Sequence, residues 1–316
     1  MDNEQTDDDT CPERLLRSRT GAPWCGSTVK AKKTPIPAVP PRVYASPRLS
    51  PDGTKVALDT RDGDRDIVTW DLGREILTRL TFDSNPERGP VWSPNGGRVA
   101  FESRRDGKLG MYWGSADGTG VPERIDVEQD TPPNIFQPKS ISPDGRWLLF
   151  YTQGDVNVID LEGDRRRKPL IRTSVDEGNG VAVSRDGRWV AYDSNESGRM
   201  EVYVRPFPAV EGIRSRVSRN GGTRPVWSHD RRELYYIEGT QRLMAVTLQP
   251  GASFSAGRPQ LLFEKSYELA TGGWTYDVSL DGQRFLMLKA VDDSESTPAP
   301  ANLVAVTGEL GKRMAA

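Results

Sequence analysis

The chain contains a single histidine, His229, so any acid–base chemistry that needs an imidazole depends on that one side chain. It stands in the run Ser228-His229-Asp230-Arg231, where similar runs have proline, and this favours an exposed turn residue. A Ser-His-Asp triad would also need a nucleophile, and the chain has no Gly-x-Ser-x-Gly elbow. Metal sites built from clustered histidines need more than one. These residues predict that the chain is not an enzyme.

Three carboxylates at alternate positions, Asp62, Asp64 and Asp66, have the spacing that begins a calcium-binding loop. The sixth position of such a loop needs glycine and the twelfth needs an acid. Here those positions hold Ile67 and Gly73. A solvated hairpin loop is therefore the favoured interpretation, and the sequence predicts neither a metal nor a cofactor.

Two other groups invite a functional interpretation. The basic run Arg165-Arg166-Arg167-Lys168 could contact phosphate, but it falls between two expected strands, where a solvated turn is favoured. Trp92 and Trp227 occupy equivalent positions in two copies of a repeat. Such placement favours packing between repeats over stacking on a ligand.

Composition excludes several classes of protein. Acidic and basic residues nearly balance, 45 against 43 in 316 residues, and the formal charge is −2. A nucleic-acid-binding protein would show a basic excess, so no nucleic-acid partner is expected. The only cysteines, Cys11 and Cys25, form no disulfide or zinc pattern. The sequence shows no signal peptide and no membrane span, so it is interpreted as cytoplasmic as written.

The elements that must position these residues are organised around six short turns. In most of them proline presets the first turn position, Asp or Asn bonds nearby backbone N–H groups, and glycine accepts a positive φ. Such turns reverse a strand and fix its register. The six are Ser50-Pro51-Asp52-Gly53, Ser93-Pro94-Asn95-Gly96, Ser142-Pro143-Asp144-Gly145, Ser184-Arg185-Asp186-Gly187, Ser228-His229-Asp230-Arg231 and Ser279-Leu280-Asp281-Gly282.

Around each turn lies a unit of up to four strand-like runs, and the units recur at intervals of about 42–51 residues. Four-stranded propeller blades repeat at roughly 40–45 residues. The second run of each unit is almost wholly apolar, as in Leu148-Leu149-Phe150, which is typical of a strand covered on both faces. The sequence therefore predicts an all-β fold, a six-bladed β-propeller of four-stranded antiparallel blades.

The predicted propeller spans residues 34–307, between a disordered or non-native tail at 1–33 and a C-terminal tail at 308–316. The sixth unit has no fourth strand, because little chain remains after Thr307. An open last blade would leave a long exposed edge. Residues around 34–37 are therefore predicted to close the ring as an N-terminal outer strand. Its prolines are tolerated at that outermost position.

The repeats resemble the TolB-like, or WD40-like PD40, propeller family over roughly residues 34–307. The resemblance rests on Pro90-Val91-Trp92-Ser93-Pro94-Asn95-Gly96, on Arg224-Pro225-Val226-Trp227-Ser228 and on the run from Ser184 to Tyr192. It implies a non-catalytic binding scaffold and carries over no catalytic residue.

The run Glu201-Val202-Tyr203-Val204-Arg205-Pro206-Phe207-Pro208 is similar to the propeller half of bacterial Ser/Thr kinases with fused sensor propellers. The kinase half has no counterpart, since neither His-Arg-Asp nor Asp-Phe-Gly occurs. One alternative is therefore a remnant of a longer, kinase-fused sensor. If the N-terminus is misassigned, the compartment would be extracytoplasmic.

Binding residues are expected in the loops opposite the six turns, where sequence varies most between units. Arginine, carboxylate and aromatic side chains, the types that dominate binding hot spots, gather there. The predicted residues are Arg88, Phe136, Glu177, Arg224 and Trp274.

The expected partner is a protein or peptide segment, with a small ligand as an alternative, and the chain is expected to be a monomer. Another interpretation is that Arg88, Glu177 and Arg224 pair with one another and hold the blades in register. A further alternative is a carboxylate-dependent lyase or hydrolase acting in the central channel.

Overall fold

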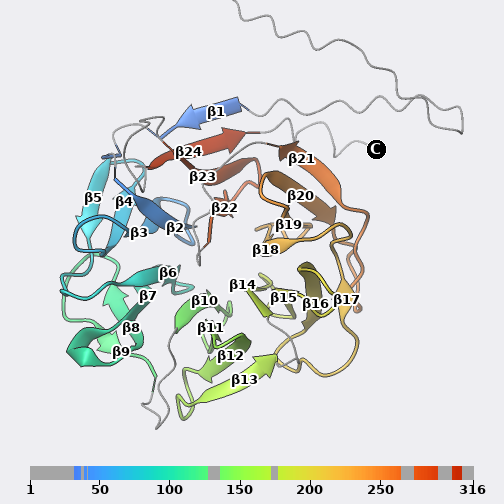
Figure 1. Ribbon diagram of the computed structural model, residues 1–316, viewed down its shortest axis with the longest axis horizontal. Coiled ribbons are helices and arrows are strands. Elements are labelled where there is room, and N and C mark those ends of the chain that lie inside the picture. The colour runs from blue at the N-terminus through green and yellow to red at the C-terminus, as the bar shows by residue number, and fades with distance from the viewer. Residues whose placement is uncertain are drawn as a thin grey trace, which may run out of the picture.

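The computed structural model describes residues 32–36, 39–40, 42–126, 136–171, 177–264, 274–290 and 301–307. These residues form four-stranded antiparallel sheets arranged in a ring, with the first strand of each unit facing the centre (Figure 1). One short 3₁₀ turn, η1 (Arg105–Gly107), accompanies the strands. The predicted fold, an all-β propeller of four-stranded antiparallel blades, is confirmed.

In the first five sheets, the strand order follows the sequence from the inner edge to the outer edge. The first three sheets are β2 (Tyr44–Leu49), β3 (Lys55–Thr60), β4 (Ile67–Asp71) and β5 (Ile76–Arg79); β6 (Arg88–Trp92), β7 (Arg98–Ser103), β8 (Gly110–Ser115) and β9 (Glu123–Arg124); and β10 (Gln137–Ile141), β11 (Trp147–Thr152), β12 (Asp155–Asp160) and β13 (Arg167–Ile171). The next two are β14 (Glu177–Val183), β15 (Trp189–Ser194), β16 (Glu201–Pro206) and β17 (Ser215–Arg216); and β18 (Thr223–Trp227), β19 (Glu233–Glu238), β20 (Arg242–Thr247) and β21 (Gln260–Glu264).

The sixth sheet combines two distant parts of the chain. It contains β22 (Tyr276–Val278), β23 (Arg284–Ala290) and β24 (Ala301–Thr307), and its outer strand is β1 (Lys32–Pro35). The register pairs Lys32 with Thr307 and Pro35 with Val304. Figure 1 shows β1 beside β24 at the rim of the ring. The predicted tails at 1–33 and 308–316 lie almost wholly outside the described residues.

The six turns have the internal bonding that their sequence predicts. In the third sheet, the hydroxyl of Ser142 donates to the carboxylate of Asp144 and accepts the backbone N–H of Trp147 at 2.8 Å. Gly145 then takes a φ of +79°, a conformation that glycine accepts without strain. The fourth sheet repeats these contacts from Ser184.

Packing between neighbouring sheets confirms the role predicted for the two equivalent tryptophans. The indole N–H of Trp92 donates to the carbonyl of Arg48 at 2.9 Å, and that of Trp227 donates to the carbonyl of Ala182 at 2.9 Å. Each bond joins one sheet to the preceding sheet, and both side chains are buried.

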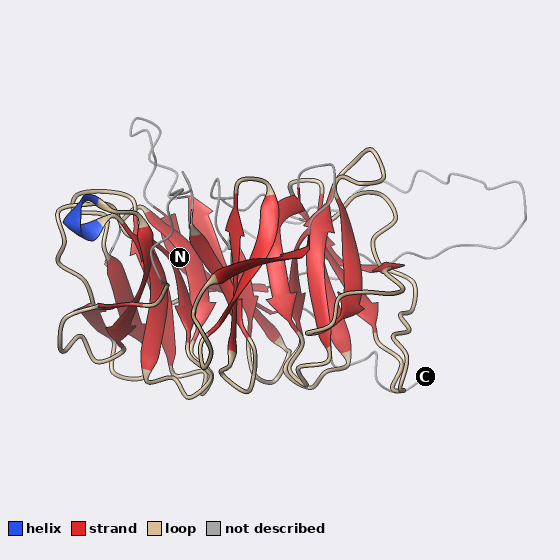
Figure 2. Ribbon diagram, turned by 90° about the horizontal axis from the view of Figure 1, so that it is seen from below, coloured by secondary structure: helices blue, strands red, loops and turns tan. Residues whose placement is uncertain are grey.

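The strands run between two faces of the ring that carry loops (Figure 2). The face with the six short turns, each joining a first strand to a second strand, is called the turn face. The opposite face, where the second strand leads into the third and the fourth leads into the next sheet, is called the loop face.

Candidate functional site

Three buried carboxylates join one sheet to the next near the loop-face end of the first strands. They occupy equivalent positions, one residue before the end of the second strand in their own sheets. Each accepts a backbone N–H from the following sheet or the segment leading into it. These bridging carboxylates are Asp59 (from Gly89, 3.5 Å), Glu102 (from Phe136, 2.7 Å) and Asp193 (from Arg224, 2.8 Å).

Asp193 accepts backbone N–H groups from two inner strands. It is 2% exposed, and its second carboxylate oxygen accepts the backbone N–H of Gly180 at 2.9 Å. Burial raises its pKa, while the bonds from Arg224 and Gly180 oppose that rise. Burial likewise raises the pKa of Glu102. Both carboxylates therefore have a structural role in the sheet interface.

A buried lysine lies among these acids. Lys139 of β10 is 2% exposed, and its ammonium donates to the side-chain oxygen of Gln137 at 2.9 Å. Burial lowers the pKa of Lys139 to about 8, and the negative charges of Asp193 and Glu102 oppose the shift. The negative charges of Asp193 and Glu102 thus offset only part of the cost of burying the ammonium of Lys139.

The two predicted aromatic binding residues lie in the core. Phe136 is 1% exposed and packs edge-to-face on Phe150, with 4.7 Å between ring centroids. Trp274 is 2% exposed, donates its indole N–H to the carbonyl of Lys139 at 3.3 Å, and lies under the guanidinium of Arg48. Both precede an inner strand closely, which explains their burial. In this structure they act as packing residues, and direct partner contact through them stays a prediction.

The three charged residues that were predicted to bind a partner lie at the loop-face ends of three inner strands. Arg88 opens β6 opposite Glu102 and is half-buried. Arg224 of β18 has a φ of +56°, and its carbonyl accepts the hydroxyl of Tyr276 at 2.9 Å. Burial lowers the pKa of Arg224, and the charge of Asp193 opposes this shift. Glu177 opens β14, and its side chain lies outside the described part of the structure.

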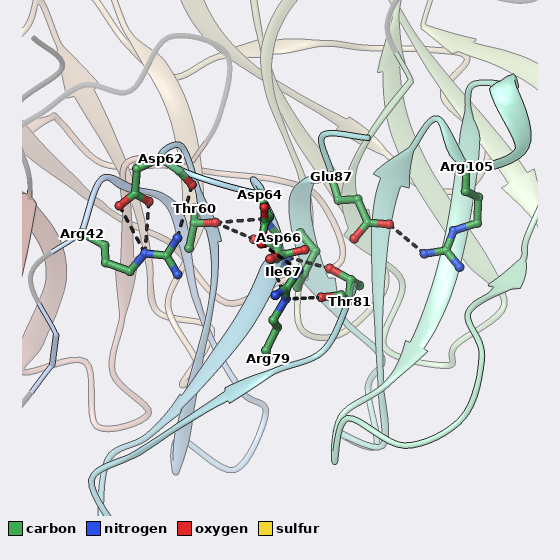
Figure 3. Close-up of polar contacts among 10 residues, drawn as sticks. All are labelled: Arg42, Thr60, Asp62, Asp64, Asp66, Ile67, Arg79, Thr81, Glu87 and Arg105. Atoms are coloured by element: carbon green, nitrogen blue, oxygen red, sulfur yellow. Dashed lines mark hydrogen bonds and ion pairs between the residues drawn. The ribbon is translucent and has the colours of Figure 1, made fainter. Parts of the chain in front are cut away.

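The calcium-like spacing of three acids has a different explanation in the structure (Figure 3). Asp62 pairs with Arg42 at 3.2 Å, whereas Asp64 and Asp66 both pair with Arg79, at 3.2 and 2.7 Å. The acids therefore bind arginines from two sides of the loop. No group of three metal-ligating side chains occurs in the part of the chain that the structure describes.

Figure 3 also shows a buried ion pair at Glu87, in the segment that leads from the first sheet into the second. Glu87 is fully buried, and its carboxylate pairs with the guanidinium of Arg105 at 2.8 Å. Burial raises the pKa of Glu87, and hydrogen bonds from Thr81, Arg105 and Ser103 oppose the rise. Like the bridging carboxylates, Glu87 stabilises the loop-face end of the ring.

His229 lies in its turn as predicted, but it is half-buried rather than exposed. Its Nε2 atom lies 3.0 Å from the guanidinium of Arg185, which belongs to the equivalent turn of the preceding sheet. Burial, together with the positive charge of Arg185, lowers its pKa to about 4.

This environment gives a direct titration prediction. Because the folded-state pKa lies below the usual value near 6.5, the unfolded chain binds the proton more readily between about pH 6.5 and 4. Stability contributed by the neutral imidazole is therefore present above about pH 6.5 and is lost as pH falls through this window. The single imidazole should titrate near pH 4 in a proton NMR titration. A midpoint at 6 or higher would contradict this burial, and Arg185→Ala should move the midpoint upward.

The bridging carboxylates were missed by the sequence reasoning, although they leave a signal. Each is followed by a hydroxyl residue at the end of an apolar second strand: Asp59-Thr60, Glu102-Ser103 and Asp193-Ser194. Charged residues are rare at fully buried positions unless they are paired, so an acid ending such a strand indicates a buried acceptor role.

A cavity of about 210 Å³ lies between the inner strands toward the turn face. Its lining includes Arg48, Trp92, Ser140, Ala182 and Trp227, one from each of the first five sheets. Within the described residues, no helix is long and apolar enough to cross a membrane.

The chain is similar in sequence to known proteins. Residues 28–182 match the family of the TolB beta propeller domain, PD40. An uncharacterized protein of Agrobacterium fabrum is 33% identical over 116 residues, which are 36% of this chain and 38% of that relative. The match thus spans well under half the length of the curated relative. The resemblance to TolB-like propellers is confirmed.

Solved structures show the same architecture. The crystal structure of TolB from Acinetobacter baumannii aligns with a TM-score of 0.58 at 18% identity, covering 85% of this chain and 64% of that one. An oligogalacturonate lyase from Vibrio parahaemolyticus aligns with a TM-score of 0.55 at 11% identity, covering 88% and 97%. At these identities the likeness shows the fold alone.

Proposed function

We propose that this chain is a non-catalytic binding module whose loop face captures a peptide segment of a protein partner. The observation that carries the proposal is the use of the buried acids. Asp59, Glu102 and Asp193 accept backbone N–H groups of neighbouring sheets or of the segments leading into them, so these three interior acids are engaged in structural contacts. Recognition is then left to the surface, where loops vary most.

The enzyme alternative requires free carboxylates in the ring interior. A general acid or base must reach the proton it transfers, and a carboxylate that accepts buried backbone N–H groups is held away from that task. The structural likeness to a lyase extends to the fold alone and leaves this alternative for experiment. Turnover on peptide or oligosaccharide panels that disappears in a folded Asp193→Asn variant would overturn the non-catalytic proposal.

The binding proposal predicts which substitutions weaken capture. Arg88→Ala and Arg224→Ala should each remove a guanidinium at the loop face, and partner recovery should fall several-fold. Trp274→Ala is less informative, because this buried side chain also supports the core. Quantitative pull-down from cell lysate, with each variant checked for folding by circular dichroism, measures the effect.

A matched control comes from the turn face. Arg284 is exposed and pairs with the exposed Asp281 at 3.7 Å. It is the first residue of β23, directly after the turn, and therefore lies at the turn face. Arg284→Ala should leave the partner list unchanged. If both loop-face variants also leave it unchanged while remaining folded, the partner binds elsewhere.

We also propose that β1 closes a six-bladed ring. Its support is the four-residue pairing with β24 and the packing of Ile36 and Val39 against the cluster that contains Tyr44 and Trp70. The hydroxyl of Tyr44 further donates to the carbonyl of Pro40 at 2.9 Å.

Truncation tests this closure. Deleting residues 1–41 removes both the β-pairing and the apolar packing, and it should lower the melting temperature by several degrees. Deleting residues 1–30 spares these contacts and should change melting little. Differential scanning calorimetry of both proteins measures the difference, and equal effects would rule out the closure.

The compartment and the relation to kinase-fused sensors stay predictions. We propose that the coding DNA upstream of the chain tests both predictions. An upstream frame encoding a kinase or a membrane helix would support an extracytoplasmic parent. A promoter and ribosome-binding site directly before Met1 would support the chain as written.

A further inference from the structure

A pocket of about 580 Å³ opens on the turn face, between the fourth and fifth sheets. Its lining includes Trp189, Trp227 and Phe254, with Arg231 and Arg232. Small-molecule sites have volumes of roughly 300–1,000 Å³ and combine apolar walls with a few placed polar groups. None of the five residues predicted for the loop face lines this pocket, so it is separate from the proposed partner surface.

The apolar wall consists of three rings held against one another. Phe254 packs edge-to-face on Trp189 and on Trp227, with centroid distances of 5.4 and 6.4 Å. Trp227 is fixed by its hydrogen bond to Ala182, and Trp189 is half-buried. This arrangement presents rigid aromatic surface, against which a planar ring can pack in stacked or edge-to-face geometry.

The second wall is the connection between β20 and β21. Leu248 and Ala256 form an antiparallel bridge that closes this connection into a hairpin. From the fourth sheet, the guanidinium of Arg188 donates to the carbonyls of Gly251 and Ala252 at 3.2 and 2.9 Å. The hairpin is therefore held across the sheet boundary, and it positions Phe254 over the tryptophans.

The charges around the pocket favour an anion. The carboxylate of Asp230 accepts the hydroxyl of Ser228 and the backbone N–H of Arg232, and Asp186 accepts the hydroxyl of Ser184. Both lining acids are thus engaged within their own turns. Arg231 and Arg232 are exposed, and the described residues provide no ion pair to either guanidinium.

The backbone at Arg231 provides a second, independent observation. It has a φ of +64°, at the turn position that holds glycine in the five other copies. A non-glycine residue in this region costs on the order of 1 kcal/mol. Arg231 thus places a guanidinium at the rim of the pocket, at a turn position where glycine would adopt the same φ without strain.

We propose that this pocket binds a small molecule in which a planar ring carries an anionic group, such as an aryl carboxylate or an aryl phosphate. The ring packs on Trp189 and Phe254. The anionic group binds Arg231 and Arg232, since guanidinium groups bind carboxylate and phosphate oxygens in forked geometry.

The test uses phenyl phosphate and benzoate as probes, with ¹⁹F NMR of protein labelled with 5-fluorotryptophan. The chain has eight tryptophans, and Trp189→Phe and Trp227→Phe assign the two resonances that matter. Both probes should shift these two resonances saturably, whereas Trp113, on the second sheet, should not respond. Phenol and inorganic phosphate, each lacking one half of the proposed ligand, should bind at least tenfold more weakly.

Arg231→Gly separates recognition from folding. Glycine suits the positive φ, so this variant should melt at the same or a higher temperature, while its affinity for the ring anions falls at least tenfold. Arg284→Ala, on the turn face of the sixth sheet, should bind as the wild type does. Unchanged affinity in Arg231→Gly, or no localised shift with either probe up to millimolar concentration, overturns the proposal. Neither result bears on the loop face, whose variants are scored by pull-down.

Discussion

Replacing Asp193 by alanine is expected to lower the free energy of unfolding by about 2–5 kcal/mol, since each buried group left without its hydrogen-bond partner costs about 1–3 kcal/mol. The substitution leaves the backbone N–H groups of Gly180 and Arg224 without their acceptor. It also removes a negative charge that opposes the lowering of the pKa of Lys139 by burial. Denaturant unfolding followed by tryptophan fluorescence measures the loss.

Asp186→Ala is the matched control for this prediction. Asp186 lies in the same sheet and also accepts a serine hydroxyl and a backbone N–H, but it is exposed. Asp186→Ala should lower the free energy of unfolding by about 1 kcal/mol, the typical net contribution of one hydrogen bond. Comparable losses in the two variants would show that Asp193 does not join the fourth and fifth sheets in the way described.

The second large effect is expected from Gly180→Ala, at the same interface. A Cβ atom at this position would lie 2.7 Å from the Cα of Arg224 and 2.8 Å from a carboxylate oxygen of Asp193. The obstacle is backbone of the next sheet, so the two sheets must separate to admit a methyl group. We expect a loss of about 2–3 kcal/mol, as for overpacked cores.

Gly110→Ala tests whether the nature of the obstacle decides the cost. There the added Cβ would approach the guanidinium of Arg124 at 2.8 Å and a carboxylate oxygen of Asp126 at 3.1 Å, so the obstacle consists of side chains that can shift without separating two sheets. Gly110→Ala should therefore lower the free energy of unfolding by less than Gly180→Ala does. Thermal unfolding of both variants gives the comparison, and a larger effect at Gly110 would contradict the close approach assigned to Gly180.

Local chemistry explains how much of the fold the sequence predicts. A turn such as Ser142 to Gly145 bonds within itself, so its conformation can be inferred from four residues and their spacing. The apolar second strands are equally local, because burial on both faces requires apolar residues at successive positions. Repetition of these signals then identifies the propeller.

The candidate site is less predictable because its contacts cross between sheets. Phe136 and Trp274 have the residue types of binding hot spots, yet their burial follows from how the inner strands pack around the ring. The half-burial of His229 likewise depends on Arg185, forty-four residues earlier in the chain. The bridging carboxylates could be suspected only as acids at the ends of apolar strands, and their acceptor role requires the neighbouring sheet.

The pairing of β1 with β24 has a consequence for the order of synthesis. Lys32 leaves the ribosome about 275 residues before its partner Thr307, so β1 waits roughly 14–55 s at the usual 5–20 residues per second. Throughout that time it is a strand without its native neighbour. Its sequence, Lys-Lys-Thr-Pro, contains the lysines and proline that discourage strands from pairing with the wrong edge. The composition of β1 therefore suits a strand that must remain unpaired until translation of the propeller is complete.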